Sequence, residues 1–163
     1  MKPEICYHLP VNKNLLIQAI SEILQRNFES QKNSSKKTRA DGNDSQSKSE
    51  GKYDTRSIEE NYLADGFARQ AQAAAGAMTA FKCMPLRNFD RTTPIDLSAL
   101  VQVGFKEESV WFFLAPAAGG TEVEVEGKRI TVLSPESPLG SQLLGLKTSG
   151  LIHSPAAKIL AVE

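Results

Sequence analysis

The chain has 163 residues, of which 40% are hydrophobic and 7% aromatic, and its formal net charge at pH 7 is zero. This length suits one ordinary domain or two small ones, and a neutral chain is not expected to bind a naked nucleic-acid duplex by bulk electrostatics. No apolar run reaches the roughly 20 residues of a membrane span, and the start of the chain lacks the hydrophobic region of a signal peptide. We therefore expect a cytoplasmic protein that does not enter a membrane.

Two helices are predicted in the N-terminal half. The first spans Lys13–Phe28, where apolar residues recur at helical spacing. The second spans Tyr53–Met84, has one apolar stripe at heptad spacing, and ends at Pro85 because the residue before a proline is displaced from helical angles. A turn centred between Asp44 and Gln46 pairs the two stripes as an antiparallel hairpin, with large residues of one helix facing small residues of the other. The stripes consist of Leu16, Ile20, Ile23, Leu24 and Phe28 in the first helix, and of Leu63, Phe67, Ala71, Ala74, Met78 and Phe81 in the second.

The segment between these stripes, residues 31–52, is polar and of low complexity. It holds six basic and three acidic side chains, a net charge of +3. Such a composition is typical of a solvated connector. Its carboxylates, Asp41, Asp44 and Glu50, also allow a second interpretation. At the tip of a hairpin they would help to hold a divalent ion supplied by another protein, because magnesium takes oxygen ligands.

The period of the apolar pattern changes from 3.6 to 2 beyond Asp90, where we place the domain boundary. Residues 1–90 form the helical hairpin, and residues 91–163 form a β domain. Gly119-Gly120 and Glu126-Gly127-Lys128 supply turns, and Pro138–Leu146 is expected to form a short helix or turn over the sheet. The predicted fold class is α+β, with an N-terminal antiparallel coiled-coil hairpin followed by a small, mostly antiparallel sheet carrying one short helix. The predicted strands are ALVQVG, SVWFFLA, TEVEVE, RITVL and KILAVE.

One stretch of the second domain resembles a known family. Residues Ile130–Gly150 resemble the C-terminal domain of bacterial Gre transcript-cleavage factors, in which a strand is followed by Ser-Pro and by a proline-led segment ending in Leu-Leu-Gly and Lys. Ser49–Gln70 is similar to the start of the descending helix of GreA/GreB-like elongation factors. The resemblance implies a coiled coil followed by an FKBP-like domain. The matching positions are Ser134, Pro135, Ser137, Pro138, Leu139, Gly140, Leu143, Leu144, Gly145 and Lys147.

The resemblance also implies a function. Factors of this family bind core RNA polymerase, dock their C-terminal domain at the rim of the secondary channel, and pass the coiled coil through it. Acidic tip residues then help to hold the second magnesium ion of the polymerase, which cuts backtracked RNA itself. By this resemblance the chain is a monomeric accessory factor and not an enzyme. It has no cofactor or metal of its own, and meets nascent RNA and DNA only indirectly. The candidate docking residues are Ser134, Pro135, Ser137, Pro138, Leu139, Gly140, Gly145 and Lys147.

The tip departs from the family pattern of an Asp and a Glu three residues apart, followed by Asn. Ser47 stands three residues before Glu50, and Gly51 replaces the Asn, while Asp41 and Asp44 are three apart but lie earlier. Polymerase binding therefore carries over better than stimulation of cleavage. A factor without the tip acids would occupy the channel and inhibit transcription, or compete with other channel ligands.

Two other functions stay open. By fold analogy the β domain would be a prolyl isomerase of the FKBP type, with Trp111, Phe112 and Phe113 lining a pocket, although such an aromatic run on a strand is more often core. Alternatively, the Ala-rich run Gln70–Ala80 would allow close approach of helices in a plain coiled-coil dimer. The sequence has no P-loop, dinucleotide fingerprint or metal-ligand spacing.

Overall fold

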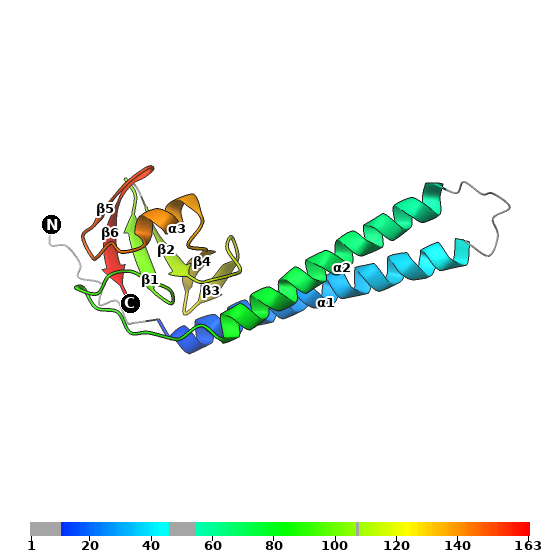
Figure 1. The fold of residues 1–163 in the computed structure, drawn as a ribbon. Coiled ribbons are helices and arrows are strands. Elements are labelled where there is room, and N and C mark those ends of the chain that lie inside the picture. Colours follow the sequence, from blue (N-terminus) through cyan, green and yellow to red (C-terminus); the bar gives the residue numbers. More distant parts are fainter. Residues whose placement is uncertain (1–10, 46–54, 107) are drawn as a thin grey trace. The chain divides into compact units, whose positions relative to one another are not determined.

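The computed structural model describes residues 11–45, 55–106 and 108–163. Within these residues, two long helices precede a six-stranded sheet with one short helix, as Figure 1 shows. The predicted α+β class, with a helical pair before the sheet, is confirmed. The elements are α1 (Lys13–Ser45), α2 (Thr55–Lys82), β1 (Leu100–Gly104), β2 (Ser109–Leu114), β3 (Glu122–Val125), β4 (Lys128–Leu133), α3 (Pro138–Leu143), β5 (Leu151–His153) and β6 (Ala156–Val162).

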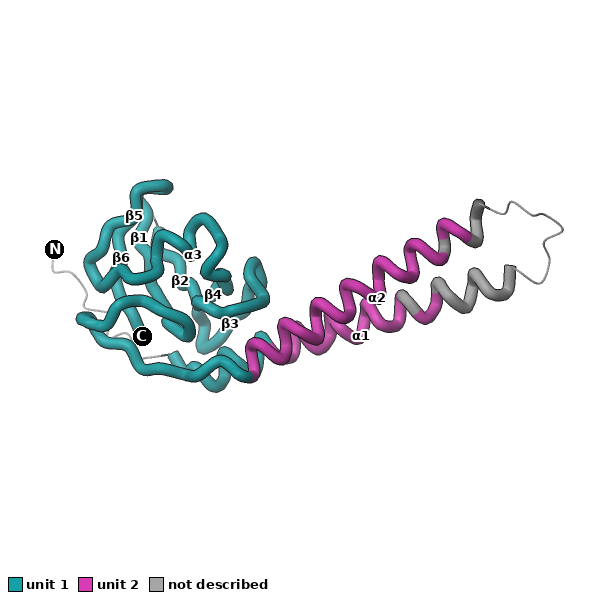
Figure 2. The backbone as a smooth tube through the Cα atoms, in the orientation of Figure 1, with its two compact units in different colours: residues 1–20, 83–163 teal, residues 21–82 magenta. Residues whose placement is uncertain are grey.

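The chain divides into two compact units (Figure 2). The helical unit comprises residues 21–82 and contains most of α1 and all of α2. The sheet unit comprises residues 1–20 and 83–163, and contains the first two turns of α1, the sheet and α3. The helical unit is thus an insertion whose two ends both lead into the sheet unit.

The two long helices differ in extent from their prediction. α1 continues past Phe28 to Ser45, and α2 begins at Thr55. A turn centred between Asp44 and Gln46 is therefore wrong, because Asp44 lies inside α1. The residues after Phe28 include the good helix formers Gln, Lys, Arg and Ala, which allow the helix to continue without an apolar stripe. None of the described helices is long and apolar enough to cross a membrane.

The helical unit buries a narrow stripe from each helix. On α1, Leu24 is buried, and the stripe continues through the partly buried Phe28 and Gln31. On α2, Ala64 is fully buried, whereas the predicted stripe residue Leu63 is 54% exposed. Neighbouring residues on a helix point about 100° apart, so the buried stripe of α2 begins one position later than predicted. Further along α2 it includes the partly buried residues Phe67, Ala71, Ala74 and Met78, as predicted.

The sheet has the strand order β3-β4-β2-β1-β6-β5. All neighbouring strands are antiparallel except β2 and β4, which pair in parallel with Trp111 opposite Ile130. The predicted hairpin between TEVEVE and RITVL is confirmed as β3–β4. Glu126 and Gly127 at its turn both have positive φ angles, 52° and 74°, which the favoured two-residue hairpin turn requires. The short edge strand β5 was not predicted.

Both faces of the sheet carry buried side chains. One face forms a cluster with Ile95 and with Leu143 of α3. Residues on a strand alternate between faces, so Trp111 and Phe113 of β2 point away from that cluster, while Phe112 and Leu114 point into it. All four of these β2 residues are at most 8% exposed. The aromatic run is therefore part of the core. The cluster consists of Ile95, Ala99, Val101, Val103, Phe112, Leu114, Leu143, Ile152, Ile159 and Val162.

Candidate functional site

The segment that resembles the Gre domain forms a capped turn that leads into α3. The Oγ atom of Ser137 donates a hydrogen bond to the carbonyl oxygen of Ser134 (2.7 Å) and accepts one from the backbone N–H of Gly140 (3.0 Å). Ser137 is the N-cap of α3, and Pro138 occupies the first turn, where a proline costs no hydrogen bond. These residues therefore determine where α3 begins.

The two glycines of this segment have structural roles. A Cβ at Gly140 would overlap the carbonyl oxygen of Ser134 and lie 2.7 Å from Oγ of Ser137. Gly145 has a φ angle of 78°, which favours glycine after a helix end. Its N–H donates to the carbonyl of Ile95, whose own N–H donates to the carbonyl of Leu146, both at 2.8 Å. This pair of bonds ties the end of α3 to the segment that leads into the sheet.

The candidate docking residues thus differ in what they offer to a partner. Pro138, Gly145 and Lys147 are exposed, whereas Gly140 is buried. The remaining four, Ser134, Pro135, Ser137 and Leu139, are partly buried. The structure places all eight in and around α3, but it does not bring them together as one polar cluster.

A cleft beside α3 adds residues that were not selected from the sequence. Its volume is about 530 Å³, and its walls include Phe89, Pro94 and the partly exposed Leu144, next to Gly145. At its edge the guanidinium of Arg87 forms a 2.6 Å ion pair with the carboxylate of Asp96. The cleft exists because the hydrogen bonds of Ile95 hold residues 87–96 against the end of α3. No sequence pattern marks residues 87–96 as part of a surface site.

The predicted tip carboxylates are described only in part. Asp41 and Asp44 lie in the last turns of the α1 backbone, but their side chains, and the whole of Glu50, fall outside the described residues. Within the part of the chain that the structure does describe, no group of His, Cys, Asp or Glu side chains is arranged to hold a metal ion.

The start of α1 forms a second feature of the sheet unit. Asn12 caps the helix as its Oδ1 accepts the N–H groups of Asn14 (3.0 Å) and Leu15 (3.4 Å). The N–H of Val11 donates to Glu163 after β6, and that of Asn12 donates to Glu126 in the β3–β4 turn. Two glutamates at separate points of the sheet unit thus bind the backbone of Val11 and Asn12, the entry to α1.

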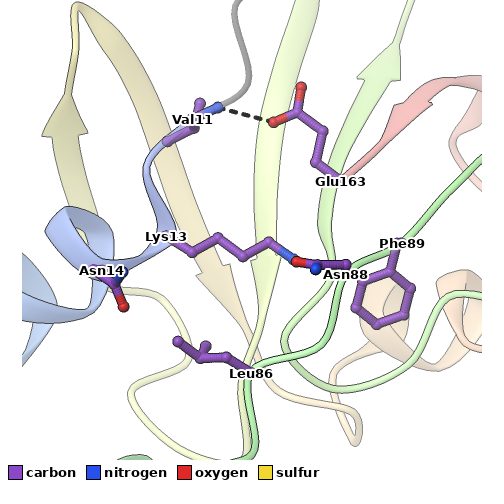
Figure 3. A pocket seen from close by; sticks show the side chains of 7 residues that line it. All are labelled: Val11, Lys13, Asn14, Leu86, Asn88, Phe89 and Glu163. Atoms are coloured by element: carbon purple, nitrogen blue, oxygen red, sulfur yellow. Dashed lines mark hydrogen bonds between the residues drawn. The ribbon is translucent and has the colours of Figure 1, made fainter.

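Lys13 lies in a pocket at this entry (Figure 3). The pocket has a volume of about 430 Å³ and is lined by Val11, Lys13, Asn14, Leu86, Asn88, Phe89 and Glu163. The Nζ atom of Lys13 donates to the carbonyl oxygen of Arg87 (2.7 Å) and lies 4.9 Å from the centre of the Phe89 ring. Burial lowers the pKa of Lys13 to about 8, although the carboxylate of Glu163 acts in the opposite direction.

Asp90 stabilises the segment between the pocket and the cleft. Its Oδ1 atom accepts hydrogen bonds from both the backbone N–H and the hydroxyl of Thr92 and of Thr93, at 2.7–2.8 Å. These bonds favour the charged carboxylate and lower its pKa well below the ordinary range. The role of Asp90 is therefore to stabilise a turn. Residues next to this turn line both the pocket beside Lys13 and the cleft beside α3.

No family model and no curated protein matches the chain. Among solved structures, it is similar to the GreA factor homolog 1 (Gfh1) protein of Thermus thermophilus, with 14% identity over 89% of this chain and 95% of that one, and a TM-score of 0.34. A structure of the transcription factor Gfh1 has 12% identity over 89% and 94% of the two chains, with a TM-score of 0.36. Gfh1 of Thermus aquaticus has 16% identity over 90% and 95%, with a TM-score of 0.34. At such identities and TM-scores, none of the three assigns a function to this chain.

Proposed function

We propose that this chain is a transcription elongation regulator that binds core RNA polymerase and acts through its secondary channel. The observation that supports the proposal is a two-helix unit, residues 21–82, whose two ends both lead into one sheet unit. The sheet unit carries the segment that resembles the Gre domain. α1 has 33 residues, which at about 1.5 Å per residue gives a helix roughly 50 Å long. A helix of this length is suited to reach a site inside a larger assembly.

In this proposal the two units have different tasks. The sheet unit docks at the channel rim through the exposed residues around α3, including Lys147. The helical unit enters the channel. The protein is a monomeric, cytoplasmic accessory factor without a catalytic centre, cofactor or metal ion of its own. Any magnesium ion involved belongs to the polymerase.

The role at the polymerase active centre depends on the carboxylates between the helical stripes. In two-metal hydrolysis one ion activates the attacking water and the other stabilises the leaving oxygen. Asp41 and Asp44 are three residues apart on α1, a spacing that places two positions on one side of a helix. With Glu50 they are the candidates to complete the second metal site. Binding without this contribution would give an inhibitor of transcription.

The first experiment measures binding of the purified chain to core polymerase. We expect binding at micromolar protein, weakened by Lys147→Glu. Lys158→Glu is the matched control, because Lys158 is also an exposed lysine of the sheet unit, on β6, and its replacement should leave binding unchanged. Absence of binding by the wild-type chain at micromolar concentration would refute the proposed function.

The second experiment measures transcript cleavage in stalled elongation complexes. If the carboxylates complete the metal site, the triple variant Asp41→Ala, Asp44→Ala, Glu50→Ala binds the polymerase normally and loses the stimulation of cleavage. If cleavage by the triple variant equals that by the wild type, the carboxylates have no such role and only the binding part of the proposal stands.

A further inference from the structure

Lys13 is partly buried and lines an open pocket at the start of α1. The pocket of about 430 Å³ has apolar walls from Val11, Leu86 and Phe89. In Figure 3 the Lys13 side chain extends toward Asn88 and Phe89, with Glu163 on one side and Leu86 on the other. We propose that Lys13 is an acylation site, whose amine accepts a short acyl group from a thioester that enters this pocket.

The geometry leaves the amine able to react. Its hydrogen bond to the carbonyl of Arg87 (2.7 Å) uses one N–H, and the lone pair of a neutral lysine amine is not needed for that bond. The Phe89 ring lies 4.9 Å from the amine and covers it on one side. A lysine that is desolvated in an apolar pocket is one of the recognised forms of activated nucleophile.

The surroundings also select the donor. Among the described residues, two carboxylates lie at this entry to α1: Glu163, which lines the pocket, and Glu126, which accepts the N–H of Asn12. Two carboxylates disfavour an anionic donor such as an acyl phosphate. The apolar walls fit a short hydrocarbon chain. The pocket therefore fits a neutral thioester with a small acyl group.

The protonation of Lys13 gives an estimate of its reactivity. With a pKa of about 8, half of the Lys13 amines are neutral at pH 8, compared with roughly 0.4% for an ordinary lysine of pKa about 10.4. The neutral fraction is thus higher by about 100-fold. A weaker base is also a weaker nucleophile, by roughly tenfold if amines follow the slope of about 0.45 known for thiolates. The net expectation is a reaction about tenfold faster than at an exposed lysine.

The reaction balances without a further reagent. The neutral amine attacks the carbonyl carbon of the thioester, the C–N bond forms, and the C–S bond breaks. The thiolate leaves and takes up the proton that the nitrogen releases. The amide product keeps one N–H for the carbonyl of Arg87, but it has no charge. Acylation therefore removes the positive charge at the first residue of α1.

The test uses the full chain and the acetyl thioester of N-acetylcysteamine at low conversion, with site-by-site quantification by peptide mass spectrometry. The exposed Lys147 and Lys158 are internal references. We expect Lys13 to react about tenfold faster than either reference at pH 8. Its rate should level off above about pH 9. In urea, where the pocket is lost, all three rates should become equal.

Two results would overturn the proposal. One is a Lys13 rate at pH 8 no higher than that of Lys147 and Lys158. The other is an advantage of Lys13 that persists in urea, because it would then come from local sequence and not from the pocket. The proposal does not depend on polymerase binding, so failure of one leaves the other unaffected.

Discussion

Replacing Gly140 by alanine tests how the segment before α3 is built. The added Cβ would overlap the carbonyl oxygen of Ser134 and lie 2.7 Å from Oγ of Ser137. The first oxygen belongs to the backbone, and the second is held by hydrogen bonds to Ser134 and Gly140. The same Oγ accepts the N–H of Gly140, so a shift that makes room for the methyl group also disturbs the helix cap. We therefore expect Gly140→Ala to destabilise the sheet unit.

The expected magnitude has two parts. Overpacking of a close contact costs about 1–3 kcal/mol, and loss of an N-cap hydrogen bond costs about 1 kcal/mol. The free energy of unfolding should therefore fall by roughly 2–4 kcal/mol. Trp111 is the single tryptophan of the chain and is buried in β2, so its fluorescence reports unfolding of the sheet unit in urea. For an m-value of about 2 kcal/mol/M, the midpoint should fall by about 1–2 M.

Gly76→Ala is the matched control. A Cβ at Gly76 meets no atom within 4 Å, and Gly76 lies inside α2. The control should leave the Trp111 midpoint unchanged and stabilise the helix by about 0.5–1 kcal/mol, because alanine loses less backbone entropy than glycine. If Gly140→Ala also left the midpoint within about 0.3 M of the wild type, the close packing of Gly140 against Ser134 would be refuted.

Two further predictions concern the helical unit and the pocket. Leu24→Ala should destabilise the helical unit by about 2–5 kcal/mol, measured by helical circular dichroism in urea. Leu63→Ala should change the stability of this unit by less than about 0.5 kcal/mol. Equal effects of the two substitutions would contradict the assigned stripe. For Lys13, the pKa falls from 10.5 to about 8 on folding, so between these values the unfolded chain binds more protons and the stability should rise with pH. The difference between 10.5 and about 8 corresponds to a rise in stability of roughly 3 kcal/mol across this pH range. Lys13→Met should abolish it and Lys158→Met should not, and a rise that survives in Lys13→Met would contradict the assignment.

The sheet was largely predictable because β3 alternates apolar and polar residues, and β1, β2 and β4 are rich in β-branched or aromatic residues. The hairpin at Glu126 and Gly127 followed from local turn chemistry. The parallel pairing of β2 with β4 could not be predicted in this way. β3 lies between these two strands in the sequence, and the usual expectation is antiparallel pairing of consecutive strands. The parallel pairing is explained by burial: β3 exposes Glu122 and Glu124 and suits an edge, whereas β4 buries Ile130 and Val132 completely and suits the interior. β5 was missed because three residues are too few for any periodicity.

The helical unit was predictable in kind but not in extent. Apolar stripes locate the part of a helix that packs, so the prediction ended α1 at Phe28, the last large apolar residue. The observed helix continues to Ser45. Residues 29–45 contain no large apolar side chain that would indicate this continuation. The error at Leu63 has a similar origin. Leu63 is the larger side chain, but the buried stripe passes through Ala64, which allows closer approach of a second helix.

The candidate docking residues show most clearly where sequence reasoning stops. A resemblance in the run Ser134–Gly140 follows from the fold itself, because Ser137 caps α3 and Gly140 has no room for a side chain. Ser137 and Gly140 therefore have little left to offer a partner. If this segment docks on a polymerase, the contact must come from exposed neighbours such as Pro138, Leu144 and Lys147. Loss of binding in Gly140→Ala would therefore report a damaged fold, whereas loss of binding in Lys147→Glu with an unchanged Trp111 midpoint would report a lost contact.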